Sequence, residues 1–146
     1  MYKTKQRFCA ILLALSLLLS LGALSASAAE TRSSSYLSRY SAALSQGKQS
    51  GSVKVTYYVR AKILTTTWIG VNRIVVYRSD GSIYKTVTGT TANGLLKNSG
   101  VAVLSGSYTM ACEPNTTYYA RVTLLAADDS GSDTGVIVTN SVTSPA

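Results

Sequence analysis

Three aspartates in one short segment are the side chains of this chain that could do acid–base or metal chemistry. Asp128, Asp129 and Asp133 lie close together, with only Ser and Gly between the second and the third. Two carboxyl groups can hydrolyse a glycoside as acid and base. Three carboxylates could supply part of a calcium site, which needs about six to eight oxygen ligands. The EF-hand spacing and its closing Glu are absent. The segment therefore favours a solvated loop between two strands, with calcium binding at 128–133 as the open alternative.

Histidine is missing from the whole sequence. It is the usual general base, the usual activator of Ser and Cys nucleophiles, and a common zinc ligand. No Gly-x-Ser-x-Gly sequence and no Gly-rich phosphate loop takes its place. We therefore predict a protein that is not an enzyme and that has no catalytic residues, no metal site and no cofactor.

Cys112 is the one cysteine that remains after a predicted leader of residues 1–29, since Cys9 lies within that leader. Cys112 alternates with Tyr108 and Met110, so the three side chains share one face of a strand. We predict a buried, unreactive thiol that fills a small apolar space, and no disulfide. The alternative is an exposed thiol bonded to another chain.

Trp68, Tyr58 and Tyr119 are the candidate binding residues. Tyr58 and Tyr119 fall on strand faces that alternation predicts to be exposed, and exposed aromatic rings offer flat surfaces for sugars. Tyrosine is also a good strand former without any ligand, and Trp68 beside Ile69 would equally cap the core. A glycan-binding face and a plain structural role both stay open.

A turn motif begins at Cys112. After this apolar position, Pro114, Thr116 and Tyr118 follow at two-residue steps. The motif resembles the turn into the sixth strand of fibronectin type III domains, with Cys112 where leucine is usual. The resemblance implies that Pro114 and Thr116 shape the turn and that the Tyr118 hydroxyl bonds back to the backbone. It supports a fold rather than a function.

Over most of its length the chain also resembles a group of small secreted proteins from Gram-positive anaerobes. The matching features are a Ser/Tyr-rich start, a Gly-Lys-Val-like strand, an Ile-Gly step and a Ser-Gly-Ser-Asp loop, here at 33–42, 51–55, 69–70 and 130–133. The group has no assigned activity, so the resemblance implies a secreted protein without naming its ligand.

Residues 1–29 have the three parts of a secretory signal peptide. A basic start containing Lys3, Lys5 and Arg7 precedes an apolar run over 8–21 and the small residues 26–28. The apolar run is shorter than the ~20 residues of a membrane helix. We expect residues 30–146 to form one secreted, extracellular domain that keeps no membrane span.

Charge argues against nucleic acid as a partner. The formal net charge is +8, and once the leader is removed eleven Lys and Arg against six acids leave +5. These basic residues are scattered singly, whereas a nucleic-acid binder concentrates them on one face. A net charge of this sign still favours weak attraction to anionic polymers outside the cell.

Alternation with a period of two residues predicts the fold. It is clearest over 52–63, where 53, 55, 57, 59, 61 and 63 face inward, and it returns over 74–77, 83–87, 108–112, 118–126 and 135–142. Asp80-Gly81 predicts a hairpin with a type I′ turn, and 89–106 predicts turns around short extended pieces. Residues 36–44 fit a strand or a helical stripe, and their serines favour a strand. About seven strands predict an all-β antiparallel β-sandwich of the fibronectin type III or immunoglobulin kind.

The sequence thus predicts a secreted, non-enzymatic, monomeric binding module. Its partner would be a glycan, a cell-wall polymer or an extracellular protein. The alternative is a structural extracellular subunit that self-associates through edge strands or Tyr-rich faces.

Overall fold

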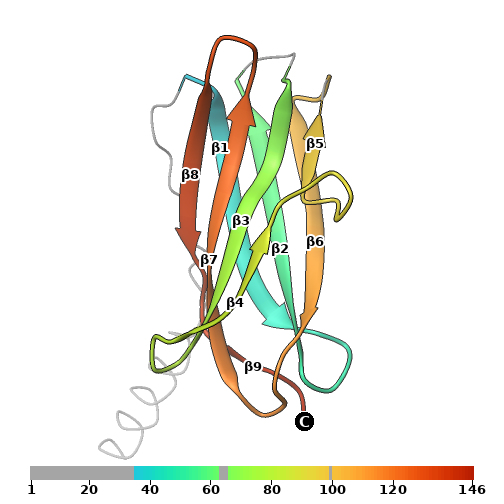
Figure 1. Ribbon diagram of the computed structural model, residues 1–146, viewed down its shortest axis with the longest axis vertical. Helices are drawn as coiled ribbons and strands as arrows, with labels where there is room; N and C mark the ends of the chain where they lie inside the picture. The colour runs from blue at the N-terminus through green and yellow to red at the C-terminus, as the bar shows by residue number, and fades with distance from the viewer. Residues whose placement is uncertain (1–34, 63–65, 99) are drawn as a thin grey trace, which may run out of the picture.

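The computed structural model describes residues 35–62, 66–98 and 100–146, and their only regular structure is β-strand (Figure 1). The predicted leader, the start of the predicted domain at residue 30, and Ile63 lie outside these ranges. The strands are β1 (Leu37–Gln46), β2 (Ser52–Ala61), β3 (Trp68–Arg78), β4 (Ile83–Thr88), β5 (Leu96–Asn98), β6 (Val103–Ala111), β7 (Thr117–Ala127), β8 (Ser132–Val138) and β9 (Val142–Thr143). The first segment is therefore a strand, as its serines predict. Within the described ranges, no helix long and apolar enough to cross a membrane occurs.

Two antiparallel sheets pack face to face and confirm the predicted all-β sandwich. One has the order β1-β2-β6; the other has the order β4-β3-β7-β8, with β5 also paired to β3 and β9 to β7. In Figure 1 β3, β4 and β7 cross in front of β1 and β2. The described residues form nine strands rather than about seven. The additional ones, β5 and β9, have three and two residues, which is too short for alternation to reveal.

The core lies between the sheets and follows the predicted alternation. In β2 the side chains of Val53, Val55 and Val59 are fully buried, while Thr56 and Arg60, which alternate with the buried positions, are exposed. In β7 the even-numbered residues from Tyr118 to Ala126 are all fully buried. Each sheet therefore has one apolar face and one outer face, and the outer faces are the surfaces available to a partner.

The β3–β4 hairpin is present, but the predicted type I′ turn is wrong. That turn needs positive φ at both central residues, and here only Gly81, at 85°, has it while Asp80 does not. The backbone closes instead through Gly81 N–H to Arg78 O and Arg78 N–H to Ser82 O, both at 2.9 Å. The Asp80 carboxylate accepts the Ser82 N–H at 2.8 Å. The aspartate therefore stabilises the turn with its side chain, and glycine supplies the left-handed residue that follows.

Two strand boundaries also differ from the sequence expectation. β6 begins at Val103, inside the region predicted to hold turns. Its first seven residues lie at a sheet edge and are only half-buried or exposed, so no row of buried side chains marks this part of the strand in the sequence. The predicted last strand, 135–142, is interrupted: β8 and β9 pair with two separate stretches of β7. At the break, the Thr139 hydroxyl accepts the Ala120 N–H at 2.9 Å, so a side chain continues the pairing there.

Candidate binding site

The three predicted binding residues do not come together. Tyr58 lies on β2, on the outer face of the three-stranded sheet, whereas Trp68 and Tyr119 lie on the outer face of the other sheet. Trp68 pairs with Ala127 and Tyr119 pairs with Tyr77, nine positions further along β3. At about 3.3 Å per residue, this places Trp68 and Tyr119 about 30 Å apart. Trp68 is 41% exposed and does not cap the core.

Tyr119 is instead part of an aromatic pair. Its ring stacks on that of Tyr77, with the ring centroids 5.1 Å apart and the planes inclined by 10°. The two residues are directly opposite each other in the β3–β7 pairing, where side chains on one face are in reach. The stack therefore follows from the strand register, and the two rings orient each other on the outer face.

Beside this pair, the outer face of β4, β3 and β7 contains an open depression of about 360 Å³. We call it the arginine–tyrosine depression. It is lined by Arg73, Val75, Tyr77, Ile83, Thr86, Arg121 and Thr123. Its short side chains are those of Thr86 and Val75, which are directly opposite each other, and of Thr123, which is diagonal to Val75; longer side chains line the rest of it. The depression exists because short residues on three adjacent strands meet between long ones.

Strand pairing explains how residues distant in sequence meet here. Arg73 is opposite Thr123, Val75 is opposite Arg121, and Tyr77 is opposite Tyr119 on β7. On the other side of β3, Val75 is opposite Thr86 and Tyr77 is opposite Ile83. The lining residues from β3 face outward because Ile74 and Val76, which alternate with them, are fully buried.

The depression is electropositive. Strands β3, β4 and β7 contain no acidic residue, and Arg73 and Arg121 are both exposed. Within the described ranges, the only ion pair joins Arg78 to Glu113, so neither Arg73 nor Arg121 is neutralised by a carboxylate. The acid nearest to Arg73 in the sequence, Asp80, belongs to the β3–β4 turn. Hydrogen bonds from Ser82 lower the pKa of its carboxyl group.

Large apolar side chains are also exposed on this face. Ile83, at the edge of the depression, is 60% exposed, and Val138 on β8, opposite Arg121, is 59% exposed. Sequence analysis missed these two residues, as well as Arg73, Tyr77 and Arg121. Alternation with the buried residues Ile74 and Val76 could have identified the exposed residues of β3. It does not indicate which strands pair with β3.

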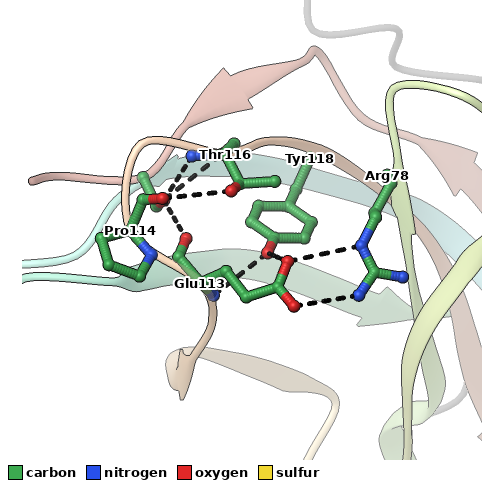
Figure 2. A network of polar contacts seen from close by, with 6 residues as sticks. Arg78, Glu113, Pro114, Thr116 and Tyr118 are labelled. Atoms are coloured by element: carbon green, nitrogen blue, oxygen red, sulfur yellow. Dashed lines mark hydrogen bonds and ion pairs between the residues drawn. The ribbon is translucent and has the colours of Figure 1, made fainter.

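The predicted corner is a compact polar network (Figure 2). The Tyr118 hydroxyl accepts the Glu113 N–H at 3.1 Å, which is the backbone contact that the motif implies. The Glu113 carboxylate accepts two bonds from the Arg78 guanidinium, at 3.2 and 3.5 Å. The Thr116 hydroxyl donates to Pro114 O at 3.1 Å. The network joins the β6–β7 turn to the end of β3, and its groups are occupied with one another.

Ser144 completes this corner from the far end of the chain. It is 2% exposed, and its hydroxyl donates to Glu113 O at 2.6 Å and accepts the Thr116 N–H at 3.2 Å. The arrangement is that of a structural clasp, because the polar atoms are satisfied within the protein.

Cys112 lies just beyond β6 and is only partly buried, although it packs against the core as its alternation with Met110 predicts. Burial raises the pKa of the thiol, with Lys85 acting in the opposite direction. A raised pKa leaves less of the reactive thiolate at neutral pH. Cys112 is a free thiol.

The loop predicted over 128–133 is shorter in the structure: Asp128 and Asp129 lie in the turn between β7 and β8, whereas Asp133 belongs to β8 and pairs with Ala126. The Asp128 carboxylate accepts the N–H groups of Ser130 and Gly131 at 2.7 and 3.0 Å. The Asp133 carboxylate accepts the Tyr36 N–H at 2.8 Å. No group of three or more His, Cys, Asp and Glu side chains that could hold a metal ion occurs in the part of the chain that is described. The carboxylates therefore fold the loop and fasten it to the start of β1.

Comparison with known proteins supports the fold and gives no information on activity. No protein-family model matches the chain, and no curated protein matches it. Among solved structures, the chain is similar to a Bordetella pertussis protein assigned as ApaA, with a TM-score of 0.51 and 11% sequence identity, over 70% of this chain and 89% of that one. At this identity the likeness concerns the arrangement of strands and carries no activity.

Proposed function

We propose that the protein is a secreted, monomeric binding module of the fibronectin type III or immunoglobulin kind, not an enzyme, and that it attaches to a glycan or cell-wall polymer outside the cell. The observation that carries the proposal is the arginine–tyrosine depression. It combines two unneutralised guanidinium groups, an aromatic ring stacked on its cross-strand neighbour and short side chains on three paired strands.

The dimensions and chemistry of the depression support a polymer segment as ligand. Ligand sites of about 300–1,000 Å³ are typical for small molecules, and this one falls at the lower end and is open rather than enclosed. A polymer ligand needs an open site, because the polymer extends beyond the bound segment at both ends. Arginine donors and the Tyr77 ring together suit a ligand that is polar at its edges and apolar on its face.

The experiment is retention on purified Gram-positive cell walls and on mucin across a salt series. We expect wild-type protein to be retained at low salt, and Arg121→Gln to bind about tenfold more weakly, which corresponds to ~1.4 kcal/mol. Arg60→Gln, on the outer face of the other sheet, makes the same change of charge and should bind like wild type.

Two results would contradict the proposal. The first is an absence of wild-type retention at low salt. The second is an equal loss in Arg121→Gln and Arg60→Gln, which would mean that overall charge alone drives retention. Concentration-dependent self-association without retention would favour the structural-subunit alternative, for which Ile83 on β4 and Val138 on β8 provide exposed apolar side chains on two separate strands.

A further inference from the structure

We infer that the arginine–tyrosine depression recognises an acidic sugar, a ring that carries a carboxylate, sulfate or phosphate group. Arg73 and Arg121 bind the anionic group and Tyr77 contacts the sugar ring. The inference rests on the proposed function, because it specifies the ligand class of the same site.

The two arginines are placed to act on one anion. Arg73 is opposite Thr123, and Arg121 lies two positions before Thr123 on β7, so the arginines are diagonal cross-strand neighbours. Diagonal neighbours have side chains about 7–8 Å apart at their bases, within reach of a common ligand for long side chains. Like charges at this distance repel each other, and a bound anion removes that repulsion.

Guanidinium geometry selects the kind of anion. Each guanidinium presents five donors in a planar fork that matches the paired oxygens of a carboxylate, sulfate or phosphate. In the described part of the chain, no hydrogen bond or ion pair from the Arg73 or Arg121 side chain is found, whereas Arg78 is occupied by Glu113. Both forks are therefore available to a ligand.

Tyr77 is placed for the sugar ring rather than for the anion. It lies four positions from Arg73 along β3, about 13 Å away, and borders the same depression. Tyr119 stacks against Tyr77 at 5.1 Å and does not line the depression. Tyr119 is thus a positioning residue, which covers one ring face of Tyr77 and fixes its orientation.

The short side chains of the depression suit the hydroxyl groups of a sugar. Thr86 is directly opposite Val75 on β4, and Thr123 on β7 is a diagonal neighbour of Val75. The two threonine hydroxyls can donate and accept hydrogen bonds, and Val75 presents an apolar surface beside them. An inorganic anion would use the arginines and leave these short side chains and the Tyr77 ring without contacts.

The test compares polymers that differ only in charge. Affinity is measured for immobilised polygalacturonate, for the same polymer with its carboxyl groups reduced to alcohols, and for sulfated and phosphorylated dextran beside plain dextran. We expect at least one acidic polymer to bind about tenfold or more tightly than its neutral counterpart. Comparison of the carboxylated, sulfated and phosphorylated polymers then identifies which anionic group is preferred.

Lysine variants distinguish recognition of the anion by the planar guanidinium group from attraction by positive charge alone. Arg73→Lys and Arg121→Lys keep the charge and lose the fork, so each should weaken binding of the preferred acidic polymer about tenfold or more. Arg60→Lys is the matched control on the opposite face and should bind like wild type. All three positions are exposed, so we expect the variants to fold like wild type.

The outcomes distinguish the inference from the proposed function. Equal binding of acidic and neutral polymers overturns the acidic-sugar inference and leaves the glycan-binding proposal intact. Unchanged affinity in both Arg73→Lys and Arg121→Lys overturns the assignment of the anion to these two residues. Binding to no polymer, together with no retention on cell walls, overturns both.

Discussion

Removing the hydroxyl group of Tyr118 should lower the free energy of unfolding by about 1–3 kcal/mol. The Tyr118 side chain is fully buried. Its hydroxyl accepts the Glu113 N–H at 3.1 Å and donates to the Glu113 carboxylate at 3.4 Å. Tyr118→Phe removes the first bond, worth about 1 kcal/mol, and leaves the N–H without that partner. The second bond is long and involves a half-exposed carboxylate, so it contributes little.

Two further tyrosines provide controls for the same chemical change. The Tyr40 hydroxyl is buried and, among the described residues, has no hydrogen-bond partner. An unpaired buried hydroxyl is costly, so Tyr40→Phe should raise the free energy of unfolding by about 1 kcal/mol. Tyr119 is half-buried on an outer face, and Tyr119→Phe should change stability by less than about 0.5 kcal/mol.

Urea unfolding measures all three variants. Trp68, the one tryptophan of the chain, provides a fluorescence signal, and an unchanged dependence on urea concentration would show that only stability differs. Equal losses in Tyr118→Phe and Tyr119→Phe would refute the register of β7, because a shift by one residue exchanges the two faces. A loss in Tyr40→Phe would show that its hydroxyl has a partner.

Two further predictions concern charge. Arg39 and Arg60 are directly opposite each other on the outer face of β1 and β2, so Arg60→Thr should raise stability by about 0.2–1 kcal/mol by removing a like-charge pair; a lower thermal midpoint would contradict this. Burial raises the pKa of Tyr57 and of Tyr118 above the usual value of 10.0. The unfolded chain therefore loses these protons first, so stability should fall as the pH rises above about 10, and an unchanged urea midpoint there would count against burial of these hydroxyls.

Sequence reasoning succeeds where one face of a strand is buried. Val53, Val55 and Val59 alternate with polar residues, and burial of one face leaves only one register that keeps them inside. It fails where tertiary pairing or side chains decide the local structure. The turn at Asp80 is set by a carboxylate that caps Ser82, and the break near Thr139 is bridged by a hydroxyl.

The candidate site was largely beyond reach of the sequence for a related reason. Its residues come from three strands, and Arg73 and Arg121 lie far apart in the chain, so their proximity depends on which strands pair and in what register. Tyr119 could be proposed because alternation shows its exposure. Alternation from Ile74 and Val76 would place Tyr77 on an outer face as well, but its pairing with Tyr119 could not be predicted, since nothing in either segment indicates that β3 and β7 are neighbours.

The clasp formed by the last residues has a consequence for how the protein folds. Ser144 binds Glu113 and Thr116, Pro145 O accepts the Gly51 N–H at 2.9 Å, and Asn140 exchanges two bonds with Leu44 of β1. Contacts between residues almost a hundred positions apart form slowly, because a long loop must close first. During folding β1 can pair with β2 early, because the two strands are adjacent in the sequence, yet the free edge of β1 is not covered until residues 140–145 have docked on it. Folding of this domain is therefore completed by the docking of these residues, and until then the edge of β1 is open to pairing with other chains.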